Sequence, residues 1–444
     1  MGTGMKIKLP QAVEEIIGRI NDAGYEAYIV GGCVRDTLLH KEPNDWDITT
    51  SATPVQVKAI FKRTIDTGIQ HGTVTVMKHR QGYEVTTYRI DGAYEDARHP
   101  KEVIFTPDLR EDLKRRDFTI NAMAYHPDSG LVDPFDGRKD LEDHVIRCVG
   151  DPRERFSEDA LRMMRAVRFA AQLDYKIEER TWEAIKELAP TIGKISAERI
   201  QTEMVKLLLS DHPEQFRSFY QCGLTAYFLP EFDQMMTTVQ NNPHHCYTVG
   251  EHTIHGLSYI KSEQSLRLAM LLHDIAKPVT KTTDERGVDH FRGHPERGSK
   301  MAEDILRRLK FDNHTIAMVK GLVAYHDRRI EPVERAMRKA LHQIGEEYFP
   351  ALFEVREADV MAQSEYQKEE KLDAIKEGLR IYQKIKKEGQ CISLRSLAVN
   401  GGDLIRAGIE PGQEIGMILE QMLQDVIGDP SHNTKEYLMQ RYVP

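Results

Sequence analysis

The chain has 444 residues, of which 40% are hydrophobic and 30% charged, and its formal net charge is −9 at pH 7. This length predicts two to four domains, and the composition is typical of a soluble globular protein. The acidic balance does not indicate a general nucleic-acid binder, although a local basic patch can still bind nucleic acid. No apolar run is long enough to cross a bilayer, so no membrane partner is expected.

The five cysteines are scattered and form no C-x-x-C pair. This pattern favours reduced thiols over disulfides or a zinc finger. The N-terminus "MGTGMKIKLP" lacks the apolar core of a signal peptide. Together these features predict a cytoplasmic protein. They do not indicate an oligomeric state.

The first part of the chain is predicted to mix helices and strands. A helix is expected between Pro10 and Gly24, because its apolar residues recur at helical spacing, and "EAYIVGG" then forms a short buried strand. Two β-rich runs follow, "DWDITT" and "GTVTVMKHRQGYEVTTYRI", and the second should turn at Gln81-Gly82. Neither a dinucleotide fingerprint nor a βαβ repeat is present.

Helical periodicity dominates after Gly150-Asp151-Pro152. Pro230 with "NNPHHCYTVG" indicates one boundary within this helical part, and a Lys/Glu-rich stretch near 368–390 indicates another. We therefore predict the α+β class, with a mixed head followed by all-α domains. The expected boundaries are 1–147 for the head, 148–228 for a helical neck, 229–367 for a body and 368–444 for a tail.

Two aspartates stand close together in "DWDI". If this segment is a strand, Asp45 and Asp47 share one face, while Trp46 and Ile48 share the other. Two carboxylates on one face repel each other unless a cation lies between them, and Mg²⁺ prefers such oxygen ligands. The alternative is an ordinary exposed turn, since "KEPNDWD" is rich in turn formers.

The surrounding motifs make the metal interpretation more specific. The segment "GGCVRDTLLHKEPNDWDITT" resembles the signature of the polymerase β-type nucleotidyltransferases, in the branch that contains bacterial CCA-adding enzymes and poly(A) polymerases. This resemblance implies a polymerase β-type head in which Asp45 and Asp47 hold catalytic Mg²⁺ and Glu84 is the third catalytic carboxylate. It also implies that the nucleotide is held by Gly31, Gly32 and Arg35.

Two later motifs of the head fit the same family. "RRDFTINAMAYHP" resembles its next block, which implies that Arg116 and Asn121 bind the triphosphate and that Asp117 supports them. "DGAYEDARHPKEVIF", residues 91–105, resembles its flexible loop. CC-adding relatives have a shortened loop, so the complete loop favours CCA addition, while addition of A alone stays open.

The segment "SEDALRMMR" has a local and a functional interpretation. Locally, Ser157 is a helix N-cap and Glu158 forms an i,i+4 pair with Arg162. By resemblance, the E-D-x-x-R motif is a protein template in which Asp159 and Arg162, three residues apart on one helix face, contact the nucleobase, with Arg165 beside them. A carboxylate accepts from the exocyclic amine of C or A, and a guanidinium donates to their unprotonated ring nitrogen. U and G would present mismatched groups, which is costly.

Histidines recur through the second half in "GEHTIHGL", "LLHDIAKP", "FRGHPERG" and "AYHDR". A lone histidine is more often an ordinary residue than a ligand, but a His-Asp doublet inside an apolar helix needs a partner or a metal. The set resembles the HD phosphohydrolases. This resemblance implies a divalent metal, of unspecified identity, bound by His252, His273, Asp274 and Asp359, with His294 and His326 holding a second ion.

Taken together, these motifs imply a tRNA nucleotidyltransferase that adds C, C and A from CTP and ATP without a nucleic-acid template and releases pyrophosphate. The tail, including "SLAVNGGDLIRAGIE", resembles the segment of that family that reaches toward tRNA. The alternatives are a poly(A) polymerase, an enzyme that adds only A, an HD phosphohydrolase with a regulatory head, and a non-catalytic RNA-binding protein.

Overall fold

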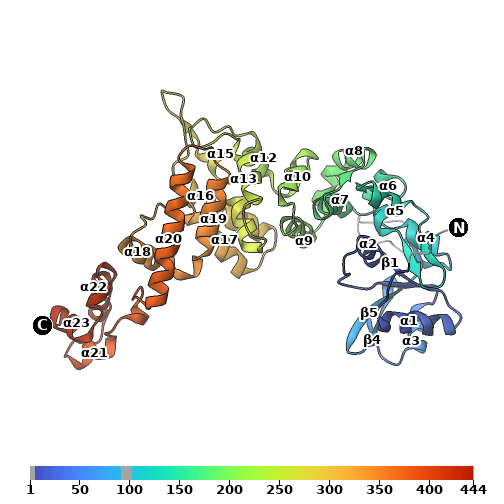
Figure 1. Ribbon diagram of the computed structural model, residues 1–444, viewed down its shortest axis with the longest axis horizontal. Coiled ribbons are helices and arrows are strands. Elements are labelled where there is room, and N and C mark those ends of the chain that lie inside the picture. Colours follow the sequence, from blue (N-terminus) through green and yellow to red (C-terminus); the bar gives the residue numbers. More distant parts are fainter. Residues whose placement is uncertain (1–5, 92–102, 444) are drawn as a thin grey trace. The chain divides into compact units, whose positions relative to one another are not determined.

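The computed structural model describes residues 6–91 and 103–443. It consists of two compact units, one ending at Phe228 and the other beginning at Leu229 (Figure 1). The first unit contains a mixed sheet followed by helices, and the second is almost entirely helical, which confirms the predicted α+β class. None of the described helices is both long and apolar enough to cross a membrane.

The head of the first unit is built on a seven-stranded mixed sheet with the strand order β3-β4-β5-β2-β1-β8-β9. Strands β2 and β5 are parallel, and all other neighbours are antiparallel. The strands of this sheet are β1 (Ala27–Val30), β2 (Ile48–Thr50), β3 (Thr64–Gly68), β4 (Thr73–Lys78), β5 (Gln81–Thr87), β8 (Ala124–His126) and β9 (Gly130–Val132).

Short helices accompany this sheet. The first one begins after Pro10 and buries the apolar stripe that the sequence predicts. A small antiparallel pair, β6 (Arg89–Asp91) and β7 (Val103–Phe105), lies outside the main sheet. The helices are α1 (Gln11–Asp22), α2 (Gly32–Leu38), α3 (Pro54–Ile60), α4 (Leu109–Lys114), α5 (Gly137–Glu142) and the 3-10 turn η2 (Thr119–Asn121).

The hairpin between β4 and β5 turns at a different place from the one predicted. Gln81 and Gly82 pair with Lys78 and Met77 in the ladder, and the turn is formed by His79 and Arg80. Both turn residues have positive φ, 49° and 68°, as a two-residue turn of type I′ requires. Glycine was therefore a misleading signal here, because Gly82 instead gives room to the side chain of Thr75 on the neighbouring strand.

Helices α6 to α11 complete the first unit. Their packing includes contacts between α7 and α9 and between α6 and α8. A two-residue parallel bridge, β10 (Val145–Ile146) with β11 (Lys176–Ile177), joins this region to the end of the head. The helices are α6 (Pro152–Glu158), α7 (Leu161–Leu173), α8 (Glu179–Leu188), α9 (Ala197–Leu208), α10 (Arg217–Gln221) and α11 (Thr225–Phe228).

The second unit begins with a helical body in which α13, α14, α16, α17 and α19 pack around buried histidines. A short hairpin, β12 (Thr282–Thr283) with β13 (Asp289–His290), precedes α16. The helices are α12 (Pro230–Thr237), α13 (Val249–Leu257), α14 (Gln264–Leu272), α15 (Lys277–Thr280), α16 (His294–Arg308), α17 (Asn313–Tyr325), α18 (Glu334–Ile344) and α19 (Ala351–Met361).

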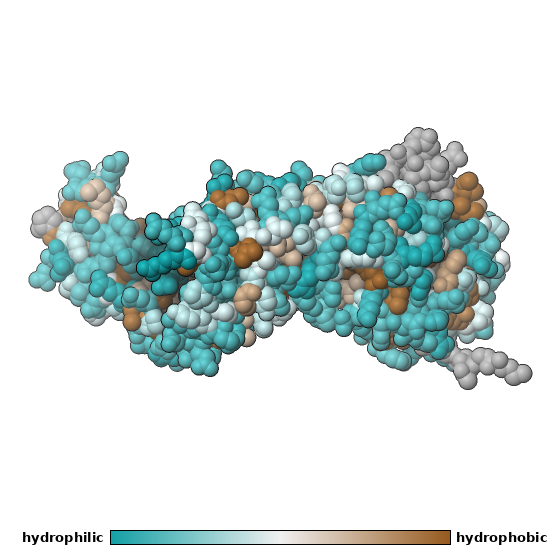
Figure 2. Space-filling model, turned by 90° about the horizontal axis from the view of Figure 1, so that it is seen from above, coloured by the Kyte–Doolittle hydropathy of each residue, from teal (hydrophilic) through white to brown (hydrophobic). Residues whose placement is uncertain are grey.

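The Lys/Glu-rich stretch forms one long helix, α20 (Lys368–Glu388), which packs on α18 and α19 through buried isoleucines. Helices α21 (Gly401–Arg406), α22 (Gln413–Gly428) and α23 (Lys435–Tyr442) then enclose a small apolar core of their own. Polar residues cover most of the face in Figure 2, and apolar ones are scattered over it. Such single exposed apolar residues are normal on a protein surface.

Candidate functional site

Three carboxylates gather at the start of strand β2, beside the middle of the parallel strand β5. Asp45 and Asp47 come directly before β2, because the strand itself starts only at Ile48. The two strands are parallel and pair Ile48 with Val85. Asp47 and Glu84 each come one residue before this pair, so they lie opposite each other on the same face. The predicted strand over "DWDI" was thus too long, but the structure brings the predicted carboxylates together.

The electrostatics of these carboxylates favour a cation. Loss of contact with water raises the pKa of Glu84, and the negative charges of Asp47 and Asp45 raise it further. Desolvation also raises the pKa of Asp47, while Arg116 opposes that change and Asp45 adds to it. The neighbouring negative charges therefore make Glu84 and Asp47 harder to ionise, and oxygen ligands of this kind suit a hard divalent ion.

Gly31 lies between strand β1 and helix α2, next to an arginine. Its φ is +80°, and a Cβ atom here would lie 2.8 Å from Nη1 of Arg116. Glycine is thus needed both for the backbone conformation and for the approach of the guanidinium. Gly32 is less constrained, since its nearest neighbour would be Arg35 at an ordinary contact distance. Burial lowers the pKa of Arg116, and Asp112 and Asp47 counteract this effect.

A chain of hydrogen bonds joins the head to helix α7. Arg35 donates from Nη1 to Oδ1 of Asn121 (2.8 Å), and Asn121 donates from Nδ2 to Oδ1 of Asp117 (3.1 Å). The other oxygen of Asp117 accepts from Nε of Arg165 (2.8 Å). Burial alone would raise the pKa of Asp117, but Arg165 and Asn121 hold it below its usual value. The structure therefore connects all four predicted residues.

Phe169 on α7 was not predicted, yet it lies at the centre of this region. The guanidinium groups of Arg35, Arg165 and Arg168 lie 5.1, 5.4 and 3.6 Å from the centroid of its ring. Phe118 from the head packs edge-on against the same ring. Cation–π attraction of this kind helps to fix the positions of the arginines. A phenylalanine in an apolar helix gives no sequence signal for such a role.

The helix predicted over "SEDALRMMR" is broken in the structure. Helix α6 ends at Glu158, Asp159 is extended with φ −145° and ψ 103°, and α7 begins at Leu161. Ser157 therefore lies inside α6 and is not an N-cap. Instead, Oδ1 of Asp159 accepts from the backbone N–H of Leu161 (3.1 Å). The prediction that Asp159 and Arg162 lie on one helix face was consequently wrong.

Asp159 and Arg162 are each held by a different partner. Both oxygens of Asp159 accept from Arg199 on α9, over 2.7 and 3.3 Å. Arg162 donates from Nη1 to Glu158, the predicted i,i+4 pair (2.5 Å), and from Nη2 to the carbonyl oxygen of Arg115 (3.2 Å). Arg199 was not predicted, because no local pattern connects residues forty positions apart.

The second unit holds a cluster of four histidines around Asp274. Nε2 of His273 and of His252 lie 3.2 and 3.8 Å from its Oδ2. Nε2 of His294 and of His326 lie 3.3 and 3.6 Å from its Oδ1. The carboxylate therefore lies between two groups of potential metal ligands, His252 with His273 and His294 with His326.

Asp359 on α19 completes the first group. Its Oδ1 is 2.8 Å from Nε2 of His252 and 3.7 Å from Nε2 of His273. Burial works against a charged His273, but Asp274 and Asp359 raise its pKa to about 10. The pKa values of both aspartates are held well below their usual range by the neighbouring histidines, although burial opposes this. The pocket therefore favours positive charge at its centre.

The histidines are oriented as metal ligands require. Nδ1 of each is within hydrogen-bonding distance of a backbone carbonyl oxygen, that of Ala362, Met270, Phe291 or Val323. Such bonds fix the tautomer and leave Nε2 as a ligand atom. Nε2 of His273 and Oδ1 of Asp274 are buried without a hydrogen-bond partner, so the residues present fit a divalent ion.

Lys277 was not assigned from the sequence, although it follows Asp274 by one helical turn. Its buried ammonium lies 2.7 Å from Oδ2 of Asp274 and donates to Gln240 over 2.9 Å.

Residues 92–102, which include most of the predicted flexible loop, lie outside the described residues.

The mixed sheet, with Asp45 and Asp47 just before β2 and Glu84 on the parallel strand β5, defines the first unit as a nucleotidyltransferase. Residues 27–147 match the family described as "Poly A polymerase head domain", and residues 174–236 match the "Probable RNA and SrmB- binding site of polymerase A". Residues 296–441 match domain 2 of tRNA nucleotidyltransferases.

Relatives specify the family further. The CCA-adding enzyme of Limosilactobacillus reuteri (strain DSM 20016) is 37% identical over 453 residues, covering 98% of each chain. That of Enterococcus faecalis is 58% identical over 194 residues, 44% of this chain and 48% of the relative. The crystal structure of the Bacillus stearothermophilus CCA-adding enzyme in complex with CTP is 31% identical, covers 98% of both chains and has a TM-score of 0.74. This chain belongs to the family of CCA-adding enzymes.

Proposed function

We propose that the chain adds C, C and A to the 3′ end of tRNA, using CTP and ATP. The full-length match to CCA-adding enzymes carries this proposal, and the grouping of Asp45, Asp47 and Glu84 supports it. In the reaction, the 3′ hydroxyl oxygen forms a bond to the α-phosphorus, and the bond from that phosphorus to the β-phosphate bridging oxygen breaks. Pyrophosphate leaves, and the hydroxyl proton is lost.

We assign the first unit's residues to separate parts of this reaction. Asp45 and Asp47 would hold Mg²⁺, with Glu84 beside them, and the bound metal would lower the pKa of the attacking hydroxyl and neutralise the leaving group. Arg116, next to Gly31, and Arg35, with Gly32 and Asn121 beside it, would bind the triphosphate. Asp117 would hold Asn121 and Arg165 in place. These roles rest on the contacts described above.

We infer that Asp159 and Arg162 select the nucleobase. Asp159 would accept from the exocyclic amine of C or A, and Arg162 would donate to the ring nitrogen. The break between α6 and α7 supports this role, because it leaves Asp159 outside the helix and oriented by Arg199. Arg162 would have to exchange part of its contact with Glu158 for the base.

We retain the predicted division into head, neck, body and tail as a proposal. The boundary between Phe228 and Leu229 supports the division of neck from body, and the separate core of α21 to α23 supports a distinct tail. We also propose that tRNA contacts the neck, body and tail, chiefly through its phosphates.

The deciding experiment is incorporation of labelled CTP and ATP into tRNA that lacks its terminal CCA. We expect CTP alone to extend the tRNA by two nucleotides, and CTP with ATP to complete the CCA end. Failure to use CTP would refute the proposal. Addition of A only, and only to tRNA ending in CC, would identify an A-adding enzyme, and a run of A on generic RNA would identify a poly(A) polymerase.

We propose a second activity, phosphoester hydrolysis, for the histidine cluster. It is supported by the two groups of ligands that share Asp274. A bound divalent metal would activate water for attack on phosphorus. Water oxygen would then bond to phosphorus, the ester bond would break, and the leaving oxygen would gain a proton. Mn²⁺, Fe²⁺, Co²⁺, Ni²⁺ and Mg²⁺ all suit this mixed ligand set.

The test of this second activity begins with metal analysis of the purified chain and of the Asp274→Ala variant. We expect the wild type to bind more divalent metal and to release phosphate from a phosphomonoester when Mn²⁺ or Ni²⁺ is supplied. The variant should lose both properties. Equal metal content in the two proteins would refute a metal site at Asp274.

A further inference from the structure

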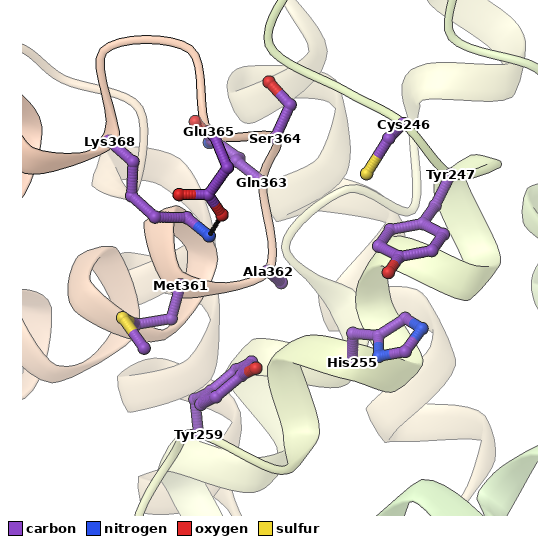
Figure 3. A pocket seen from close by; sticks show the side chains of 10 residues that line it. All are labelled: Cys246, Tyr247, His255, Tyr259, Met361, Ala362, Gln363, Ser364, Glu365 and Lys368. Carbon is purple, nitrogen blue, oxygen red and sulfur yellow. Dashed lines mark hydrogen bonds and ion pairs between the residues drawn. The ribbon is translucent and has the colours of Figure 1, made fainter.

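Asp112, on helix α4 of the head, is a carboxylate to which neither the motifs nor the proposed reaction gives a role. Its side chain is fully buried. Surface carboxylates, such as that of Glu365 beside Lys368 in Figure 3, form ion pairs that contribute little to stability. A buried carboxylate, in contrast, is strongly unfavourable unless cations and hydrogen-bond donors satisfy it. The partners of Asp112 therefore indicate what it does.

Two hydrogen bonds join Asp112 to the strands that carry the proposed metal ligands. Oδ2 of Asp112 accepts from the hydroxyl group of Thr49 on β2 over 3.1 Å. Thr49 follows Asp47 by two residues, so the two side chains lie on the same face. Oδ1 of Asp112 accepts from the backbone N–H of Arg89 over 3.3 Å, two residues after the end of β5, the strand of Glu84. Asp112 is thus fixed relative to both strands.

The same carboxylate lies beside the two arginines of the "RRDF" motif. Nε of Arg115 donates to Oδ1 of Asp112 over 2.9 Å. Nη2 of Arg116 lies 3.9 Å from Oδ2 of Asp112, which is too far for a hydrogen bond. Asp112 therefore attracts the guanidinium of Arg116 without using its N–H donors. Burial lowers the pKa of Arg116, and the negative charge of Asp112 is the largest effect that opposes this.

Arg116 is consequently held with donors available for a ligand. Its Nε is buried and has no hydrogen-bond partner among the described residues. A guanidinium presents N–H donors in one plane and suits the oxygens of a phosphate. Asp47 also attracts Arg116 electrostatically. Without Asp112, the arginine would be drawn toward this proposed metal ligand instead of being kept for a phosphate.

We propose that Asp112 is the positioning residue for Arg116. It fixes this arginine relative to Asp45 and Asp47, so that the β- and γ-phosphates of CTP or ATP meet its donors beside the metal ligands. Asp112 itself contacts neither the nucleotide nor the metal. This inference rests on the proposed nucleotidyl transfer and on binding of the triphosphate by Arg116.

The test compares how the full-length chain binds CTP and cytidine 5′-monophosphate, which lacks the β- and γ-phosphates, by isothermal titration with Mg²⁺. We expect Asp112→Asn to weaken binding of CTP about tenfold, the size of one lost ionic contact, and to leave binding of the monophosphate unchanged. In an Arg116→Met background, Asp112→Asn should have no further effect on CTP, because Asp112 acts through Arg116.

Two other variants accompany this test. Asp289→Asn is the matched control, because Asp289 is also buried and paired with a cation, Lys281 (2.8 Å), but belongs to the second unit. It should bind both ligands like the wild type. Thr49→Val is a milder change, since it removes one donor to Asp112 but keeps the charge, and it should weaken CTP binding about threefold. Circular dichroism checks folding, and Thr49→Val decides if Asp112→Asn does not fold.

The outcomes separate this inference from the proposed function. Equal weakening of CTP and monophosphate binding by Asp112→Asn would show a general structural role and overturn the inference. A loss that is equally large in the Arg116→Met background would overturn it as well. If the wild type binds CTP and the Asp112 and Thr49 variants bind it equally well, only the inference fails. A wild-type chain that binds no CTP would refute the proposed nucleotidyl transfer and the inference with it.

Discussion

Replacing Arg199 by methionine should weaken selection of the nucleobase. Arg199 makes two charge-assisted bonds to Asp159, and both side chains are mostly buried. Methionine keeps the approximate length of the side chain but leaves the carboxylate without this partner. Loss of hydrogen bonds to a charged group costs about 2 kcal/mol. If Asp159 is held in place for the base by Arg199, that cost appears as about a thirtyfold loss in kcat/KM for CTP and ATP.

The loss should be selective. Use of CTP and ATP falls, while the low rate with UTP and GTP stays the same or rises, because a mobile Asp159 no longer presents a fixed acceptor to their carbonyl groups. The measurement is single-turnover extension of tRNA lacking its terminal nucleotides, with each of the four triphosphates in turn. Arg153→Met is the matched control, since Arg153 forms an exposed ion pair with Glu187 in the same unit, and such pairs contribute little.

Two results would contradict this reasoning. If Arg199→Met keeps the wild-type ratio of CTP to UTP incorporation within twofold, the pair does not position Asp159. If Arg153→Met shows the same loss as Arg199→Met, the effect comes from general destabilisation of the helices.

Three further predictions concern other contacts. Asp47→Asn in EDTA should stabilise the fold at pH 7 by a few tenths of a kcal/mol, because the fold raises the pKa of Asp47 and so disfavours its charge. Urea unfolding should show that this gain in stability vanishes below about pH 4, where the carboxyl is protonated in both the folded and the unfolded state. A gain that persists at that pH would contradict the prediction. Gly31→Ala and Gly24→Ala should each destabilise the fold by about 1 kcal/mol, because both glycines have positive φ. Only Gly31→Ala should raise KM for CTP, since only a Cβ at this position meets Arg116. Equal KM values for the two variants would refute this prediction. Asp274→Asn should lose metal from the second unit, measured by metal analysis, yet retain CCA addition; parallel loss of addition would show that the sites are coupled.

The sequence motifs predicted the head carboxylates well because their spacing is local. Asp45 and Asp47 are two residues apart in any conformation, so their proximity needed no knowledge of the fold. The position of Glu84 beside them depends on the parallel register of β2 with β5. Only the resemblance to a family could indicate that register from the sequence.

The environment of Asp159 could not be predicted in the same way. Local preferences favour one continuous helix through Ser157, Glu158 and Arg162, yet the chain breaks at Asp159. Packing of α7 against α9 brings Arg199 to this carboxylate, and a tertiary ion pair of this kind outweighs local helix propensity. The histidine cluster shows a similar limit at one bond: Nδ1 of His252 meets the carbonyl oxygen of Ala362, 110 residues away, through tertiary packing, whereas the other three histidines meet carbonyl oxygens only three residues earlier.

The hydrogen-bond chain from Arg35 through Asn121 and Asp117 to Arg165 limits how the head can evolve or be engineered. Although the head is a recognisable module, its Asp117 is completed by an arginine that belongs to the following helices. A chimera that joined this head to the helices of an unrelated enzyme would leave a buried carboxylate without its cation, which is strongly destabilising. The head and the helices that follow it must therefore be exchanged together.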